Sequence, residues 1–223
     1  MPSMDCVFLA GASRGVGREI ARLLAEKNAV KALLRSPSAQ PELEAMGLKV
    51  AIGDALDPDA VQAAMQADPV WAVISTIGGL PKEGERADYL GNKNLIDAAV
   101  KAGVQKFILV SSLGAGNTKG AIPPQAYEAL KEVLAEKEKA EQDLIASGLT
   151  YTIIRPGGLV SEPATGNGIL TTDPTIAGSI HRADVATLVC QCLFSEKAKN
   201  QVLSAIDRHK TYVQREFEVF DLG

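Results

Sequence analysis

The stretch that decides the fold is Val7-Phe8-Leu9-Ala10-Gly11-Ala12-Ser13-Arg14-Gly15-Val16-Gly17-Arg18-Glu19-Ile20. An apolar run too short for a helix leads into a glycine-rich turn, and helix-forming sequence follows at once. This order is typical of a phosphate site, because glycines let the backbone come close to the anion and the N–H groups of the helix start then point at it. The turn residues that we expect to bind a pyrophosphate are Gly11, Ser13, Arg14, Gly15, Val16 and Gly17.

The bulk properties indicate one ordinary globular domain. The chain has 223 residues, of which 46% are hydrophobic and 22% charged, so it is long enough to bury a core. Its net charge of −4 gives no reason to expect nucleic acid. We expect no membrane span and no signal peptide, because no long apolar run is present and residues 1–5 carry no basic region. Three cysteines make no disulfide framework, so we expect a cytoplasmic location.

Short apolar runs alternate with helical patterns up to residue 155. After the first strand and helix we predict strands at 29–34, 48–52, 70–75, 106–111 and 149–155. The predicted helices between them cover 41–46, 57–67, 89–102 and 124–147. This α/β alternation indicates a Rossmann-type, doubly wound parallel sheet that is covered by helices on both faces.

The pattern loosens from Pro156 onward, where glycines and prolines mark a loop-rich region. We predict a helix at 183–194 and strands at 202–206 and 217–220. Since no linker separates this part, we interpret residues 1–223 as a single domain. Residues 1–155 would form its dinucleotide-binding core and residues 156–223 a small elaboration on the substrate side.

Residues that follow strands are the candidate ligand contacts, because an open parallel sheet binds ligands beyond the carboxyl ends of its strands. Arg35 follows the second strand, where an NAD site usually has an acidic residue, whereas a basic residue suits the 2′-phosphate of NADP. Arg14, inside the glycine turn, is a second cation that could reach the same phosphate. Both arginines could instead be solvent-facing loop residues, but without an acid at this place they favour NADP over NAD.

The loops after the third and fourth strands supply further candidates. Asp54, next to Ala55, could accept a hydrogen bond from an adenine amino group or could simply cap its own turn. Gly78 and Gly79 would let a flat ring approach closely, although a plain flexible turn would have the same sequence. Both predictions therefore depend on the glycine turn.

The helix predicted at 124–147 contains a lysine on its apolar face. Lys137 falls in the middle of that face, where a charge is costly unless it meets an anion or a polar ligand. Alternatively, its side chain reaches past the edge of the core to solvent. The residues of the predicted apolar face, taken at about 100° per residue, are Ala126, Leu130, Val133, Leu134, Ala140 and Leu144.

Two other patterns resemble catalytic motifs but have simpler explanations. Tyr127 and Lys131 form a Tyr-x-x-x-Lys pair, yet Lys131 projects away from the apolar face, so we assign it to the solvated side of the helix. Cys190-x-Cys192 has no second ligand pair, so we interpret it as two structural thiols and expect no metal site.

Ser111 and Ser112 close the fifth strand. Their hydroxyl groups could donate hydrogen bonds to a bound carbonyl or could simply satisfy the end of the strand. Neither His181 nor His209 is well placed in the sequence to act as a base for a serine nucleophile. Ser112 is therefore a candidate for substrate binding in the catalytic site.

Taken together, these segments resemble the short-chain dehydrogenase/reductase superfamily, specifically its atypical, NmrA-like NAD(P)H-binding branch. The likeness covers nearly the whole chain, with several motifs in the same order. The matching segments are 11–17, 34–35, 53–54, 89–99, 107–114, 137–141, 147–157 and 182–186.

The resemblance implies roles for several residues. In that family the glycine turn holds the pyrophosphate, while the residues that match Arg35 and Asp54 contact the 2′-phosphate and the adenine. The active-site lysine of the family falls on Lys137. By the same resemblance, Thr76, Ile77 and Gly78 would border the adenosine half of the cofactor, and Pro156, Gly157 and Gly158 would lie near the nicotinamide.

The chain departs from the family pattern in two places. Its glycine spacing is that of conventional short-chain enzymes rather than the Gly-x-x-Gly-x-x-Gly of the atypical branch. The tyrosine that would precede the active lysine by four residues is Val133, which can neither donate nor accept a proton.

Two functions therefore remain open. The chain could be an NADP(H)-binding oxidoreductase that reduces a small carbonyl or conjugated substrate, with Lys137 orienting the nicotinamide ribose or polarising the substrate. The alternative is a non-catalytic NADP(H)-sensing regulator or assembly factor, which Val133 favours. The sequence leaves the oligomeric state open.

Overall fold

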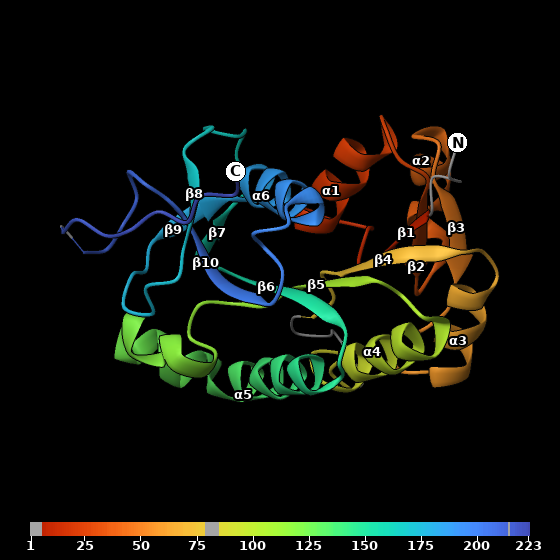
Figure 1. The fold of residues 1–223 in the computed structure, drawn as a ribbon, viewed down its shortest axis with the longest axis horizontal. Helices are drawn as coiled ribbons and strands as arrows, with labels where there is room; N and C mark the ends of the chain where they lie inside the picture. Colours follow the sequence, from red (N-terminus) through yellow and green to blue (C-terminus); the bar gives the residue numbers. More distant parts are fainter. Residues whose placement is uncertain (1–5, 79–84, 214) are drawn as a thin grey trace.

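A mostly parallel eight-stranded sheet forms the centre of the molecule (Figure 1). The computed structural model describes residues 6–78, 85–213 and 215–223, so the predictions that concern Gly79 and residues 1–5 lie outside the described residues. The strands of this sheet are β1 (Cys6–Ala10), β2 (Val30–Leu34), β3 (Lys49–Ile52), β4 (Val70–Ser75), β5 (Lys106–Val110), β6 (Thr150–Pro156), β8 (Gly168–Thr171) and β10 (Gln201–Asp207). Their order is β3-β2-β1-β4-β5-β6-β10-β8, and only the β10–β8 pair is antiparallel.

Helices cover both faces of this sheet (Figure 1). On one face lie α1 (Gly15–Ala25), α2 (Gln40–Ala45) and α6 (Arg182–Phe194), and on the other lie α3 (Pro58–Gln66), α4 (Leu90–Ala102) and α5 (Pro124–Ala146). The strands feed both layers because successive side chains of a strand point to opposite faces. In β1, Val7 and Leu9 join the core on the α1 side, whereas Phe8 and Ala10 join the core on the α4 side. The predicted doubly wound Rossmann-type fold is therefore confirmed.

The C-terminal region contains elements that the sequence did not predict. Two short strands, β7 (Gly158–Val160) and β9 (Ser179–His181), form a separate parallel pair, and β8 adds an antiparallel edge to the main sheet. Two short 3₁₀ helices, η1 (Pro37–Ala39) and η2 (Gly116–Ala121), were also not predicted. The strand predicted at 217–220 is wrong, because this segment runs beside β8 and makes only one backbone hydrogen bond to it, from Phe220 N to Leu170 O over 2.7 Å.

The predicted apolar face of α5 is only partly buried. Its fully buried residues begin at Leu134, whereas Leu130 is 43% exposed. Periodicity finds the face of a helix but not which of its turns lie against the sheet, so the prediction for Leu130 is wrong. The buried part of α5 extends from Leu134 to Leu144, and Lys137 lies within it.

Two glycines bring the start of α1 against the end of β1. A Cβ on Gly17 would collide with the carbonyl group of Gly11 and lie 2.6 Å from Thr76 Oγ1. Gly11 itself has a φ of +95°, and a Cβ there would collide with the same threonine hydroxyl. Thr76 follows β4, and its Oγ1 lies 3.2 Å from Ala10 O and 3.3 Å from Gly11 O. The turn, α1 and the end of β4 therefore meet where the strand order reverses.

A buried lysine anchors the end of α6. Lys106, at the start of β5, is 5% exposed, and its Nζ donates to Cys192 O, Leu193 O and Ser195 O over 2.6, 3.0 and 3.1 Å. Cys192 and Leu193 belong to the last turn of α6 and Ser195 directly follows it, where the last carbonyl groups of a helix have no N–H partner within the helix. Burial lowers the pKa of Lys106. The contact ties α6 to the central sheet.

The glycine contact can be tested by stability. We expect Gly17→Ala to lower the free energy of unfolding by about 1–3 kcal/mol, because the added methyl group has no space. The measurement is urea denaturation without nucleotide. Gly120→Ala is the control, since a Cβ at Gly120 meets no atom within 4 Å. Equal stability of the two variants would contradict the close contact.

Candidate functional site

The glycine turn forms the start of α1 as predicted. Gly15 has a φ of +56°, which favours glycine, and the preceding Arg14 is extended. No side chain among the described residues caps the α1 N-terminus, and its first turn contains no acidic residue. Ser13 and Arg14 are exposed beside it, whereas Val16 is buried below. Backbone N–H groups without side-chain acceptors at a helix start suit an anion.

The two arginines proposed for cofactor selection are exposed. Arg35 directly follows β2, and Arg14 lies in the glycine turn that follows the neighbouring β1. Within the described part of the chain, neither side chain makes an ion pair or a hydrogen bond. Their positive charges are therefore available to a ligand at this edge of the sheet.

The loop after β3 is held by local hydrogen bonds. Asp54 Oδ1 accepts from Leu56 N over 3.0 Å, so this carboxylate caps its own turn. Ala55 is buried, and its carbonyl group accepts from Asn94 Nδ2 of α4 over 2.9 Å. The turn-capping interpretation of Asp54 is thus confirmed for one oxygen, and the adenine contact stays a prediction.

The loop after β4 reaches the predicted lysine. Thr76 lies below the glycine turn, Ile77 is half-buried, and Gly78 is exposed with a φ of +139°. A Cβ on Gly78 would collide with Asp88 Oδ1 and lie 2.8 Å from Lys137 Nζ. Gly78 is therefore required here by the neighbouring charged pair.

Lys137 forms an ion pair with Asp88. Its Nζ lies 3.0 Å from Asp88 Oδ1, and the two side chains are 15% and 0% exposed. The buried position of Asp88 is supported from α4, where Asn92 Nδ2 donates to Asp88 O over 2.8 Å. Asn92 Oδ1 in turn accepts from Ser75 Oγ at the end of β4 over 2.6 Å. The lysine is thus an oriented, partly exposed cation and not a side chain that extends into solvent.

A narrow gap, too small to hold a water molecule, lies beside this pair. It is formed between α4, α5 and the end of β5, at the carboxyl edge of the sheet. The residues that line it are Asp88, Asn92, Leu109, Val110, Ser111, Lys137 and Ala140.

A second buried charge pair, which was not predicted from the sequence, fixes the ends of β5 and β6. Arg155 donates to Glu141 through Nε over 3.0 Å and through Nη2 over 2.6 Å. Ser111 Oγ donates to the same carboxylate. The only sequence signal was the position of Glu141, one helical turn after Lys137, which places both on one face of α5. Arg155 also donates to Asn117 Oδ1, which ties η2 to this pair.

Ser112 and Val133 differ in what they offer to a ligand. Ser112 is half-buried, and its Oγ donates to Leu113 O over 3.0 Å. Val133 is half-buried on α5, one turn before Lys137. The position where the family has a tyrosine therefore lies on the side of the helix that carries Lys137. The valine at this position has no group that can donate or accept a proton.

The predicted nicotinamide contacts lie at the end of β6, and their glycines contact protein backbone. Pro156 is buried, and a Cβ on Gly157 would collide with Gly178 O. Gly158 is exposed and begins β7, and its N–H group donates to Gly178 O over 3.0 Å. The absence of a side chain at Gly157 is therefore required by the backbone of Gly178, which precedes β9. A contact of Gly157 with nicotinamide stays a prediction.

The two alternative motifs have the structural roles that the sequence indicated. Lys131 is exposed and pairs with Glu128 over 2.9 Å. Burial raises the pKa of Cys190 to about 11 and that of Cys192 to about 12, so both thiols stay protonated near neutral pH. Among the described residues, no group of histidine, cysteine, aspartate or glutamate side chains is arranged to hold a metal ion.

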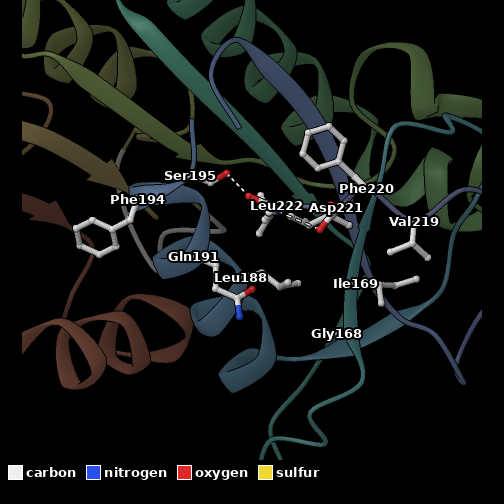
Figure 2. A pocket seen from close by; sticks show the side chains of 12 residues that line it. Gly168, Ile169, Leu188, Gln191, Phe194, Ser195, Val219, Phe220, Asp221 and Leu222 are labelled. Atoms are coloured by element: carbon white, nitrogen blue, oxygen red, sulfur yellow. Dashed lines mark hydrogen bonds between the residues drawn. The ribbon is translucent and has the colours of Figure 1, made fainter. Parts of the chain in front are cut away.

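A larger groove of about 680 Å³ lies away from these residues (Figure 2). It is formed by α6, β8 and the C-terminal segment, and it contains none of the predicted site residues. Figure 2 shows Ser195 Oγ donating to Leu222 O, which holds the C-terminal segment against α6. The residues around the groove are Gly168, Ile169, Leu170, Leu188, Gln191, Phe194, Ser195, Val219, Phe220, Asp221, Leu222 and Gly223.

Two curated proteins are similar to nearly the whole chain. The first is named "Uncharacterized sugar epimerase YhfK", from Bacillus subtilis. It is 35% identical over 201 residues, which cover 87% of this chain and 91% of the relative. The second is the sanguinarine reductase of Eschscholzia californica. It is 32% identical over an alignment of 241 positions, and the alignment covers 87% of this chain and 86% of the relative.

A solved structure with the same fold is described as ChuY, an anaerobillin reductase from Escherichia coli O157:H7. It is 36% identical to this chain, the comparison covers 91% of this chain and 97% of ChuY, and the TM-score is 0.83. A family model described as NAD(P)H-binding matches residues 11–196. This match begins at the glycine turn and extends through α6, and it agrees with the resemblance to the atypical short-chain branch. The chain belongs to the NAD(P)H-binding family.

Proposed function

We propose that this protein is an NADPH-dependent reductase of a small carbonyl or conjugated substrate. The observation that carries the proposal is the Lys137–Asp88 pair, which lies at Gly78 on the carboxyl edge of a dinucleotide-binding sheet. A partly exposed amine that is fixed by a buried carboxylate at this edge can bind a ribose hydroxyl group or a substrate oxygen. Two relatives that are named as reductases, the sanguinarine reductase and ChuY, support the choice of reaction class.

The glycine turn and the arginines beside it fit NADP(H). The Gly11–Gly17 contact leaves the α1 N–H groups facing outward for a pyrophosphate, and side chains at either glycine would close that approach. Arg35 stands where an acidic residue would bind the ribose hydroxyl groups of NAD. Within the described residues its guanidinium makes no ion pair, so its charge is available to a 2′-phosphate.

The side chains of this protein would orient the reactants and stabilise charge. NADPH, when bound, supplies the hydride. Lys137 would hold the nicotinamide ribose or polarise the substrate oxygen, and the half-buried Ser112 hydroxyl group could turn from Leu113 O to donate to that oxygen. Because Val133 holds no proton, water or the substrate would supply the proton.

A non-catalytic NADP(H) sensor is the second candidate. Val133 favours it, because the side chain one turn before Lys137 cannot transfer a proton. The Lys137–Asp88 pair favours the enzyme. We place the sugar epimerase of the YhfK name behind both, because residues 156–223 provide little room for a large substrate domain.

The location and partners follow from the same proposal. We propose a cytoplasmic protein with a small-molecule substrate, since its three cysteines are free and two of them are buried. No described helix has the length and apolar character that a membrane crossing requires.

Cofactor choice can be tested at Arg35. We expect Arg35→Asp to raise the dissociation constant for NADPH by about tenfold to a hundredfold, because charge-assisted hydrogen bonds to the 2′-phosphate are lost. NADH, which has no such phosphate, should change little. Isothermal titration calorimetry measures both, with Arg22→Asp on the far part of α1 as the charge-matched control. An equal loss for the two nucleotides would refute the role of Arg35.

Turnover can be tested at Lys137. We expect Lys137→Met to lower kcat/KM by about a hundredfold or more, because a positioned cation is removed from the reacting groups. The assay follows NADPH oxidation with a panel of quinones, aromatic aldehydes and conjugated ketones. Lys131→Met, on the solvated side of the same helix, should keep full activity.

The outcomes of this assay separate the two candidate functions. Thermal denaturation of both variants shows whether a loss reflects unfolding. Activity that survives in Lys137→Met would remove the lysine from the mechanism. Tight NADPH binding by the wild-type protein with no turnover on the whole panel would establish the sensor instead.

A further inference from the structure

We propose that Arg182 binds the pyrophosphate of the dinucleotide beside the glycine turn. The inference rests on the proposed function, and it adds a cation from the C-terminal part of the chain to a site otherwise built from the N-terminal strands. Arg182 lies in the segment 182–186 that matches the family, and its sequence context predicts no role for it.

The fold brings Arg182 to the turn. It is the first residue of α6, which packs alongside α1 on one face of the sheet (Figure 1). Each of these helices leads into a parallel strand, α1 into β2 and α6 into β10, so both helices begin at the carboxyl edge. A Cβ placed on Gly15 would lie 3.7 Å from both Cδ and Nε of Arg182. The side chain is therefore next to the N-terminus of α1.

The guanidinium group has one edge fixed and the other available. Its Nη1 donates to Leu159 O over 3.3 Å and to Ser161 Oγ over 2.5 Å. Within the described residues, neither Nε nor Nη2 has an acceptor, and no carboxylate pairs with this charge. The Nε and Nη2 donors form the edge that binds phosphate oxygens in a bidentate manner. Nε is also the nitrogen that lies next to Gly15.

The residues around Arg182 hold its backbone in place. His181 is 3% exposed, with Nδ1 lying 2.6 Å from Pro163 O and Nε2 lying 2.7 Å from Lys210 Nζ. Since a carbonyl oxygen only accepts and an ammonium group only donates, these partners assign the proton of the ring to Nδ1. Lys106 anchors the other end of the helix. The Arg182 side chain therefore extends from α6, a helix that is held in place at both ends.

The structure also offers a simpler role for Arg182, as a tether of the segment after β7. The two roles predict different effects of a substitution at Arg182. Loss of a tether would lower stability or change the substrate side of the site. Loss of a pyrophosphate contact would weaken binding only of ligands that contain a pyrophosphate. Arg182→Gln removes the charge and the guanidinium group and keeps a shorter polar side chain. Ser161→Ala removes one bond of the tether and leaves the Nε–Nη2 edge intact.

The experiment measures the dissociation constants of three ligands by calorimetry for wild type, Arg182→Gln, Ser161→Ala and the control Arg22→Gln. The ligands are NADPH, 2′-phospho-ADP-ribose, which lacks the nicotinamide, and adenosine 2′-monophosphate, which lacks the pyrophosphate. For Arg182→Gln we expect the first two constants to rise by about tenfold to a hundredfold. Adenosine 2′-monophosphate should bind as it does to wild type, and the other two variants should bind all three ligands normally.

Each other result overturns the inference in a recognisable way. Unchanged binding of 2′-phospho-ADP-ribose to Arg182→Gln would remove the pyrophosphate contact while leaving the proposed function intact. An equal loss in Ser161→Ala, or a matching fall in thermal stability, would assign Arg182 to the tether. Failure of wild type to bind any of the three ligands would overturn the proposed function, and the inference with it.

Discussion

The approach of Gly17 to the carbonyl group of Gly11 is the contact on which the rest of the structure depends. It lets the first turn of α1 lie directly against the end of β1, with Thr76 of the neighbouring β4 loop filling the space below. The end of β1 and the first turn of α1 thus meet the loop after β4, which is distant in the sequence, at the reversal of strand order. Any side chain at Gly17 would separate them, and the N–H groups of α1 would no longer face the carboxyl edge of the sheet.

Buried charges fix the other half of the site. Lys137 pairs with Asp88, and Glu141 pairs with Arg155, so one face of α5 is tied to the segment that leads into α4 and to the end of β6. Burying an ion pair involves a desolvation cost that offsets much of its attraction, so such pairs add little to stability. Their directed hydrogen bonds specify instead how α5 is oriented relative to the sheet. The position of the lysine amine follows from that orientation.

The fold was predictable for the first 155 residues because short apolar runs and helical periodicity alternate there without ambiguity. The C-terminal part was harder, since β7, β8 and β9 contain only three or four residues each and are defined by their partners. Residues 217–220 show the opposite case. Phe217, Val219 and Phe220 suggest a strand, but the segment makes one hydrogen bond to the edge of the sheet and no ladder. Strand propensity does not form a strand without a pairing neighbour. The division of the domain at residue 155 stays a prediction.

The glycine turn, the strand-and-helix order and the lysine on an apolar helix face could be predicted from the amino-acid sequence, because they depend on spacing along the chain. Which partners the charged side chains meet follows only from the packing of the folded chain. Asp88 lies 49 positions before Lys137, Arg155 lies 14 after Glu141, and Arg182 reaches Gly15 across most of the chain. Local periodicity carries no information about such pairs, since they are set by how the helices pack on the two faces of the sheet.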